Sequence, residues 1–231
     1  MTPTSHRLLG LASDRLLAEH RLATALALPT STAFASPSPD KGTASFPQTT
    51  GKHPRTEIMW NNVVPLKNQS QILVDEWGYR YMSGQQNSRL TITEDNGGLL
   101  YVDTGTAKWR DLPSTCEKRK VKQGISAWCA IPDKFAGQTM FLEVWPRLGS
   151  DWIDGSGLSK TFRLWVLADK GRDRVWGGAG DDFTNGAQGL DHIWGGGGDD
   201  WLRGGLADDV VYGDDGADYL LGMDDSDEID G

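Results

Sequence analysis

Cysteine and histidine are scarce in this chain, and each scarcity disfavours a class of site. The 231 residues contain only two cysteines, Cys116 and Cys129, and no C-x-x-C pair, which argues against a thiolate zinc site. Residues 54–167 contain no histidine, which excludes a Ser-His-Asp triad there. No uninterrupted apolar run reaches 18 residues, so we expect no transmembrane segment.

Basic residues are scarce where acidic residues are concentrated. Residues 168–231 contain sixteen Asp and one Glu against four Lys or Arg, a net charge of −13. The same segment holds sixteen of the 29 glycines. Such a segment repels nucleic acid and anionic membranes and attracts cations. Because it has little apolar surface to offset chain entropy and self-repulsion, we expect it to be disordered without a partner.

A nine-residue period runs without a break from residue 168 to residue 230. The units are ADKGRDRVW, GGAGDDFTN, GAQGLDHIW, GGGGDDWLR, GGLADDVVY, GDDGADYLL and GMDDSDEID. Position one is Gly in six units, position four is Gly in five, and position eight is apolar in all but one, where it is Thr184. Position six is Asp in every unit: Asp173, Asp182, Asp191, Asp200, Asp209, Asp218 and Asp227.

This pattern, G-G-x-G-x-D-x-U-x, resembles the RTX, or hemolysin-type, calcium-binding repeat. The resemblance implies a parallel β-roll in which two nonapeptides make one coil and each six-residue turn holds Ca²⁺. Ca²⁺ takes six to eight oxygen ligands, so a carboxylate and backbone carbonyls from two stacked turns suit it. Besides the seven aspartates, the resemblance implicates the turn glycines Gly177, Gly178, Gly180, Gly195, Gly196, Gly198, Gly204, Gly205, Gly213 and Gly216.

Aspartates 18 residues apart would be stacked neighbours in such a roll. One edge would carry Asp173, Asp191, Asp209 and Asp227, and the other Asp182, Asp200 and Asp218. We therefore expect about five Ca²⁺ ions at most, each bridging two turns. We expect the best site between Asp182 and Asp200, because both of their turns keep every glycine. Non-glycine residues should weaken other turns, and they are Asp169, Ala187, Ala207, Asp214, Met223 and Asp225.

The remaining repeat positions predict the packing of the coil. The residues at position eight should point inward and stack as an aliphatic ladder, in which the hydroxyl of Thr184 would loosen one rung. Trp176, Trp194, Trp201, Tyr212 and Tyr219 occupy positions seven and nine, so they should face outward.

Residues 54–167 have the composition of a small, antiparallel β domain. RLTIT (89–93) and LLYVD (99–103) flank a hairpin signal, and 139–145 and 161–167 are further strand candidates. A two-residue turn at Lys122-Gln123 would place Cys116 opposite Cys129, and in an exported protein we expect a disulfide. LGSDWIDG (148–155) resembles a degenerate half-repeat that caps or leads into the roll.

The N-terminal region predicts export. Residues 1–35 carry a basic region, a moderately apolar region and Ala33-Phe34-Ala35, an order that resembles a secretory signal peptide. An amphipathic helix is the alternative interpretation. Residues 36–53 are rich in Ser, Pro, Thr and Gly and are typical of a linker. Type I-secreted RTX proteins carry a secretion segment after their repeats, and because these repeats run to Gly231 an N-terminal signal is expected instead.

Together these features predict an all-β, secreted protein with a C-terminal parallel β-roll that binds Ca²⁺ and folds when Ca²⁺ is present. The arrangement is similar to that of secreted actinobacterial RTX proteins, on the phrase FLEVWPRLGSDWIDGSGLSKTFRLWVLADKGRDRVWGGAGDDF. One alternative is adhesion, with a glycan or cell-wall partner bound by the tryptophans of residues 54–167. A secreted hydrolase is a further alternative, although we expect no enzyme and no nucleic-acid partner. An open sheet edge on the last coil would also allow self-association.

Overall fold

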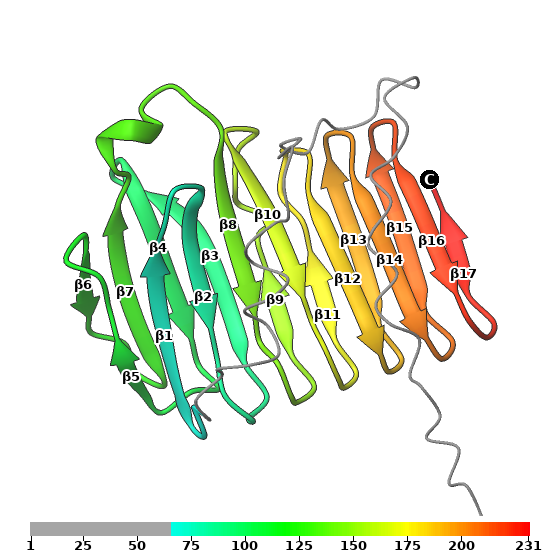
Figure 1. Cartoon of the computed structure of the whole chain (residues 1–231), viewed down its shortest axis with the longest axis horizontal. Coiled ribbons are helices and arrows are strands. Elements are labelled where there is room, and N and C mark those ends of the chain that lie inside the picture. The colour runs from blue at the N-terminus through cyan, green and yellow to red at the C-terminus, as the bar shows by residue number, and fades with distance from the viewer. Residues whose placement is uncertain (1–65) are drawn as a thin grey trace, which may run out of the picture. The chain divides into compact units, whose positions relative to one another are not determined.

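The computed structural model describes residues 66–231, and the regular secondary structure of these residues is almost entirely β-strand (Figure 1). The described part contains one turn of 3-10 helix, η2 (Asp133–Phe135). It contains no helix long and apolar enough to span a bilayer. The expected signal peptide (1–35) and linker (36–53) lie outside the described residues.

The strands form two sheets that face each other across a narrow interior. The eight-stranded sheet has the order β16-β14-β12-β10-β8-β2-β1-β5, and the nine-stranded sheet has the order β17-β15-β13-β11-β9-β3-β4-β7-β6. The strands of the first sheet are β1 (Gln69–Val74), β2 (Gly78–Met82), β5 (Lys108–Asp111), β8 (Met140–Trp145), β10 (Phe162–Leu167), β12 (Phe183–Gln188), β14 (Trp201–Leu206) and β16 (Tyr219–Met223). Those of the second are β3 (Arg89–Asp95), β4 (Gly98–Asp103), β6 (Cys116–Arg119), β7 (Ile125–Ala130), β9 (Trp152–Asp154), β11 (Arg174–Trp176), β13 (His192–Gly197), β15 (Val210–Asp215) and β17 (Glu228–Asp230).

The repeat region is a parallel β-solenoid in which the chain alternates between the two sheets. Val175 pairs with Ile193, and Ile193 pairs with Val211, so one coil takes 18 residues. Thr184 pairs with Leu202 in the same way on the other sheet. The predicted parallel roll with two nonapeptides per coil is confirmed.

The residues at position eight fill the interior, as the period predicts. Val175, Ile193, Leu202 and Val211 are at most 1% exposed, and Thr184 occupies its rung at 2%. The ladder is less complete in the last coil, where Ile229 is 46% exposed. Successive side chains alternate between the two faces of a strand, so the aromatic residues at positions seven and nine face outward, also as expected.

The solenoid extends upstream of residue 168. On the eight-stranded sheet, Tyr81, Val144 and Val166 continue the row of Thr184, and β2, β8, β10 and β12 are all parallel. On the other sheet β9 pairs in parallel with both β3 and β11. Residue 168 therefore marks a change of composition, and both sheets run through it without a break.

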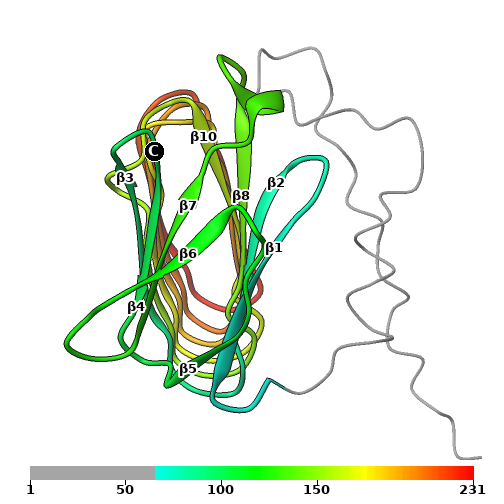
Figure 2. The same cartoon turned by 90° about the vertical axis from the view of Figure 1, so that its left-hand side faces the viewer.

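Antiparallel strands close the end of the solenoid that lies opposite the repeats. Strands β3, β4, β7 and β6 form an antiparallel series, and Figure 2 shows β6 and β7 crossing this end of the molecule. The expected hairpin of 89–93 with 99–103 is confirmed by β3 and β4, and the other two candidate strands by β8 and β10. This end rests on a large apolar core, which includes Tyr79, Tyr81 and Tyr101.

Cys116 and Cys129 form the expected disulfide. They lie opposite each other on β6 and β7, and Cys129 is fully buried in the core. The connection differs from the expected two-residue turn, because β6 ends at Arg119 and β7 begins at Ile125. The pairing of β6 with β7 keeps the expected register, because the longer loop is still centred on Lys122 and Gln123.

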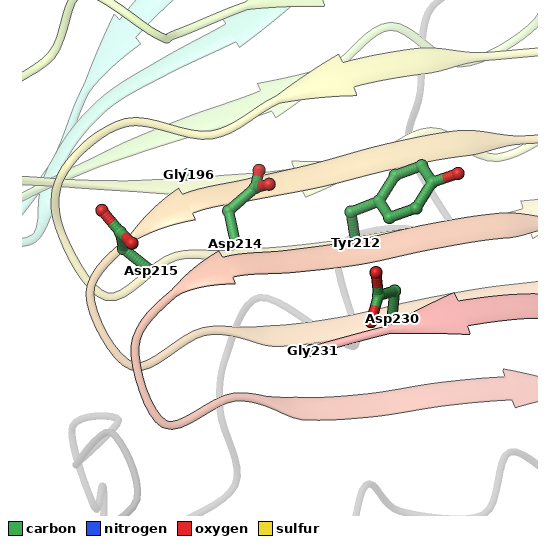
Figure 3. Close-up of a pocket in the computed structure, with 6 residues that line it drawn as sticks. All are labelled: Gly196, Tyr212, Asp214, Asp215, Asp230 and Gly231. Carbon is green, nitrogen blue, oxygen red and sulfur yellow. The ribbon is translucent and has the colours of Figure 1, made fainter.

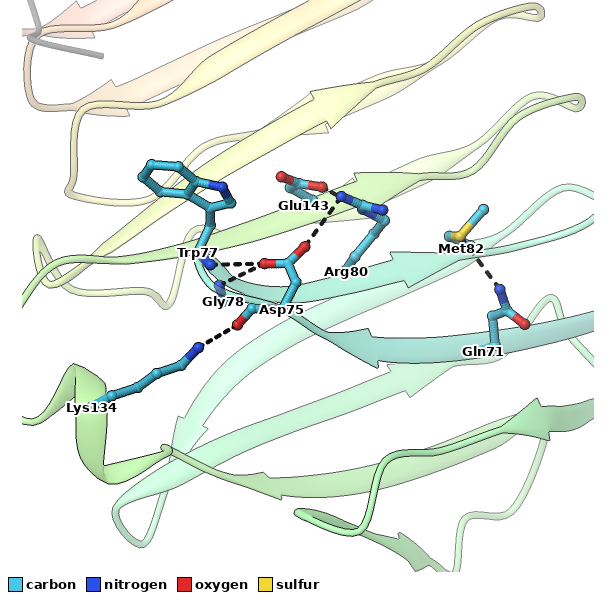
Figure 4. Close-up of polar contacts among 8 residues, drawn as sticks. All are labelled: Gln71, Asp75, Trp77, Gly78, Arg80, Met82, Lys134 and Glu143. Carbon is cyan, nitrogen blue, oxygen red and sulfur yellow. Dashed lines mark hydrogen bonds and ion pairs between the residues drawn. The ribbon is translucent and has the colours of Figure 1, made fainter. Parts of the chain in front are cut away.

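A polar cluster ties the first hairpin to the solenoid (Figure 4). The Arg80 guanidinium of β2 donates to the Glu143 carboxylate of β8 at 2.5 Å and pairs with Asp75 at 3.2 Å. Asp75 also accepts from the backbone N–H of Trp77, and Lys134 of η2 donates to the Asp75 carbonyl. Arg80 and Glu143 are both buried, and a buried charge needs such partners.

We expect that Cys116→Ser/Cys129→Ser lowers the free energy of unfolding. The two cysteines are 13 residues apart, and closing a loop of that size stabilises by about 3 kcal/mol. Urea unfolding of the calcium-loaded chain, with and without the substitutions, measures the difference. An unchanged unfolding midpoint would show that the buried contacts of β7 hold the hairpin without the bond.

Candidate calcium sites

The position-six aspartates form two columns of hydrogen-bonded carboxylates along the turns. Each Oδ1 accepts a backbone N–H of the preceding coil. The donor lies 18 positions earlier for six of the aspartates, so Asp200 accepts from Asp182 at 2.7 Å and Asp191 accepts from Asp173 at 2.8 Å, and it lies 22 positions earlier, at Asp151, for Asp173. The same bond recurs at 2.7–2.9 Å for all seven predicted aspartates. The structure therefore brings together the members of each expected column, one coil apart.

The second oxygen of most of these carboxylates has no hydrogen-bond partner among residues 66–231. Oδ2 is buried and unbonded in Asp173, Asp191, Asp200 and Asp209, and each of these residues is at most 2% exposed. A buried carboxylate oxygen without a hydrogen bond is unfavourable, and a bound cation removes that cost. The columns thus present the hard oxygen donors that Ca²⁺ prefers.

A glycine at position one leaves the space in which this oxygen lies. A Cβ on Gly195 would lie 2.3 Å from Asp200 Oδ2 and 2.6 Å from the carbonyl oxygen of Gly213, one coil further on. A Cβ on Gly186 would lie 2.4 Å from Asp191 Oδ2 and 2.6 Å from the carbonyl oxygen of Gly204. Carboxylate and carbonyl oxygens from two stacked turns thus approach the same point, and a side chain at position one would fill it.

Backbone carbonyls are necessary to these sites. Within residues 66–231, no three His, Cys, Asp or Glu side chains converge as they would in a site built from side chains alone. The glycines at position one have no φ in the left-handed region, so closeness to the carboxylate excludes a side chain there. The need for glycine at position one is therefore one of space, whereas the sequence pattern suggested a need for left-handed backbone in the turn.

Left-handed backbone is instead concentrated at positions two and four. Gly196 and Gly198 have φ of 97° and 111°, and glycine adopts such angles without strain. The six non-glycine residues singled out in the sequence adopt the same region, with φ between 66° and 91°. The predicted turn glycines fall at position one (Gly177, Gly195, Gly204, Gly213), position two (Gly178, Gly196, Gly205) and position four (Gly180, Gly198, Gly216).

The turn that contains Asp182 differs from the others, although its sequence is among the most regular. Gly178 and Gly180 lack a left-handed φ, and the Gly178 N–H donates to Asp182 Oδ2 at 2.6 Å. On its upstream side this turn packs on Leu158, whose carbonyl accepts from Ala179, and not on a repeat turn. Its downstream side stacks on the turn of residues 195–200, because the Gly197 N–H donates to the Gly178 carbonyl. Its carboxylate is therefore satisfied within the protein, and the geometry favours Asp191, Asp200 and Asp209 over Asp182.

Asp151 belongs to the column of Asp173, Asp191 and Asp209, although the sequence pattern did not assign it there. Its Oδ1 accepts from Ser88 N–H, its own N–H donates to Asp173 Oδ1, and its Oδ2 is buried and unbonded. The sequence does carry a signal, because PRLGSDWID (146–154) is a nonapeptide with Gly149 at position four and Asp151 at position six. In the structure Arg147 and Gly149, at positions two and four, have a left-handed φ. Four inserted residues, 155–158, separate its frame from that of the later units.

Position one is not glycine in the first two turns of this column. Pro146 precedes Asp151 and Ala168 precedes Asp173 by five residues, where the later turns have Gly186 and Gly204. Carbon atoms of these two residues occupy the space that a glycine leaves open. The fit to a cation is therefore poorer at Asp151 and Asp173 than further along the column.

Burial raises the pKa of the stacked carboxyls. It raises the pKa of Asp191 and of Asp209 to about 6, of Asp200 to about 7 and of Asp173 to about 8, and the charges of stacked aspartates add to the effect. Burial also raises the pKa of Asp182, although its two backbone hydrogen bonds act in the opposite direction. A bound cation favours the ionised form, so Ca²⁺ binding would release protons.

These features define a calcium-binding parallel β-solenoid, and comparison with known families agrees. Residues 165–193 and 194–229 match the RTX calcium-binding nonapeptide repeat in four copies. This part of the chain therefore consists of RTX calcium-binding repeats, whose β-roll is a non-catalytic architecture that is typical of secreted proteins. Comparisons with curated proteins and with solved structures give no match.

Outward-facing aromatic side chains stack along both sheets. On the nine-stranded sheet, the ring centroids of Trp176 and Trp194 are 4.6 Å apart with planes 3° apart, and Trp152 lies 4.4 Å from Trp176. On the other sheet, Trp165 and Phe183 are 4.8 Å apart. At these separations each ring covers its neighbour, so the rows stabilise the stacking of coils and offer few open faces to a sugar.

Two other groups on the outer face of the nine-stranded sheet lie apart from the carboxylate columns. His192, at position seven of its unit, has its pKa lowered by burial and by the nearby Arg174 and Arg172. Asp214, Asp215 and Asp230 surround a hollow beside Tyr212 (Figure 3). Their carboxylates are exposed, in contrast to the buried oxygens of the columns.

We expect the calcium-free chain to lose stability as pH rises from about 4 to about 7. The carboxyls titrate near 4 when unfolded and near 6 to 7 in folded Asp191, Asp200 and Asp209, so the folded state holds the protons longer. Urea unfolding of the metal-free protein at pH 5 and pH 7.5 measures this, and Ca²⁺ should remove the difference. Greater stability at pH 7.5 without Ca²⁺ would contradict the buried, unpaired state of the columns.

Proposed function

We propose that the repeats bind Ca²⁺ between successive turns and that Ca²⁺ drives the folding of this part of the chain outside the cell. The buried, unbonded Oδ2 atoms carry the proposal, because those of Asp191 and Asp200 face a point that a carbonyl of the next coil also approaches. The cation would be held by Asp191 with Gly204, by Asp200 with Gly213, and by Asp209 in the corresponding turn. Its role is to neutralise charge and to join coils.

Coupled folding follows from the composition of the coils. The core cluster inside the later coils consists of Ile193, Leu202 and Val211, with Leu220 partly buried beside it. Full burial of each such side chain stabilises by about 1.5–3 kcal/mol, which is small beside the entropy of ordering about 1–2 kcal/mol per residue over these coils. Carboxylate repulsion adds to the deficit, so binding energy from a cation must supply the remainder.

An extracellular setting fits both the disulfide and the metal. Disulfides persist in oxidising compartments, and a chain of this kind would remain unfolded where free Ca²⁺ is scarce. Export of the unfolded repeats followed by folding in Ca²⁺-rich surroundings is the order of events that we propose. No particular contact among the described residues supports glycan binding through the tryptophans of residues 54–167, or hydrolysis by that region.

We expect the calcium-free, full-length chain to gain β-structure when millimolar Ca²⁺ is added at pH 7.5. Far-ultraviolet circular dichroism measures the gain. Three of the ten tryptophans, Trp176, Trp194 and Trp201, lie in the repeats, so a change in tryptophan emission should accompany it. Mg²⁺ at the same concentration is the control, because it demands a small octahedral shell and dehydrates reluctantly. Identical spectra with and without Ca²⁺ would refute coupled folding while leaving binding to be measured separately.

The binding sites can be tested with two matched substitutions. Asp200 and Asp151 are equally buried, both have an unbonded Oδ2, and burial raises the pKa of each to about 7. They differ at position one, which is Gly195 for the first and Pro146 for the second. We expect Asp200→Asn to lower the number of bound Ca²⁺ ions and Asp151→Asn to leave it unchanged.

Isothermal titration calorimetry on the full chain counts the ions in both variants. Asparagine keeps the oxygen that accepts the backbone N–H and replaces the charged, unbonded oxygen with a neutral NH₂ group, so both variants should fold in Ca²⁺. An unchanged count in Asp200→Asn would refute the assignment of the carboxylate columns. A lower count in Asp151→Asn would refute the role given to glycine at position one.

A further inference from the structure

Positive charge is concentrated at the end of the solenoid that is closed by antiparallel strands. Between Lys108 and Lys122 the chain carries six basic and two acidic residues. Strands β5 and β6, which hold most of them, are the last strands of the two sheets at this end. Residues 204–231, which include β16 and β17 at the opposite ends of the sheets, carry ten carboxylates and no basic side chain.

The lysines of this segment are exposed and largely without partners. Lys118, Lys120 and Lys122 are exposed and form no ion pair within residues 66–231. Glu117 pairs with Arg119, whose guanidinium also lies over the Trp128 ring at 5.6 Å. The charge of the three lysines is therefore available to a ligand.

The hairpin that carries these lysines is held in place. The disulfide joins Cys116 of β6 to Cys129, which is fully buried in the core. Strand β6 pairs only with β7, so its outer edge faces away from the sheet. Because the backbone of the hairpin is already ordered, binding costs less entropy than it would for lysines of an unfolded segment, and the cluster of ammonium groups favours a ligand with many negative charges.

We propose that this surface, formed by Lys108, Arg110, Lys118, Lys120 and Lys122, binds an anionic polysaccharide. The choice among polyanions rests on what surrounds the lysines. None of the exposed large apolar side chains of residues 66–231 lies between Lys108 and Lys122, so the surface has nothing to insert into a bilayer. Trp109 and Trp128, which could stack on bases, are half-buried with their indole N–H groups bonded to the carbonyls of Ser126 and Asp95.

The disulfide adds a second reason, because it places the surface in an oxidising compartment. Outside a cell, carboxylated, sulfated or phosphorylated polysaccharides are abundant polyanions. The acidic repeats would repel the same polymer, so it would bind at the end of the solenoid and not along its length. An edge strand rich in lysine also deters pairing with other chains, and the experiment below separates that role from binding.

Fluorescein-labelled dextran sulfate, with uncharged dextran as a control, is the probe. Binding to the full, calcium-loaded chain is followed by anisotropy over a range of NaCl concentrations. We expect Lys118→Gln/Lys120→Gln to weaken binding at least about tenfold and to reduce the slope of log K against log salt by about 1.5. The matched control is Lys160→Gln/Lys170→Gln, which removes the same charge from two exposed lysines away from this surface and should bind as the parent does.

Several outcomes would overturn the proposal. Equal affinity of the two double variants would show that the charge acts only through the net field of the molecule. Tighter binding to a DNA duplex or to phosphatidylglycerol vesicles than to dextran sulfate would assign the surface to another class of partner. Concentration-dependent dimers of the parent in sedimentation, lost in Lys118→Gln/Lys120→Gln, would identify a second copy of the chain as the occupant.

Discussion

The structure of the repeats depends on a carboxylate that is only half satisfied. One oxygen of each position-six aspartate bonds to the backbone of the preceding coil and fixes the register between coils. The other is buried with no partner in four of the seven repeats. The hydrogen bond stabilises the stacking of coils, and burial of the unbonded oxygen destabilises the same stack unless a cation binds it. Glycine at position one, the stacked turns and the small interior follow from the need to bring these oxygens together.

Much of this arrangement is readable from the sequence because the period is short and strict. Once two nonapeptides make one coil of 18, residues nine positions apart lie at equivalent places on its two sides, so the two columns of aspartates and the ladder of Val175, Ile193 and Val211 follow from counting. The hairpins were also predictable, since their turn signals are local. Register between Cys116 and Cys129 needed only the symmetry of the loop between them.

What the sequence did not reveal depends on contacts between distant segments. The turn that contains Asp182 is regular in sequence, and it departs from the others because it packs on Leu158 in an inserted loop. Asp151 was recognised in a degenerate half-repeat but not assigned to a column, because four inserted residues shift its frame, although its backbone repeats that of the later turns. The upstream coils keep the shape of the repeat without its glycines, and pairing such as Tyr81 with Val144 appears only in three dimensions.

The two sheets run from one end of the described chain to the other, yet they are held by different means along their length. Around β2, β4 and β7 the interior is an ordinary core of tyrosine and aliphatic side chains closed by a disulfide. Beyond residue 168 it narrows to one aliphatic residue per strand between acidic turns. Removal of Ca²⁺ by a chelator would therefore loosen the repeat half of the two sheets, and reduction of the Cys116–Cys129 disulfide would loosen the other half. The covalently closed half would remain as a template, on whose last strands each returning coil can form its hydrogen bonds in register.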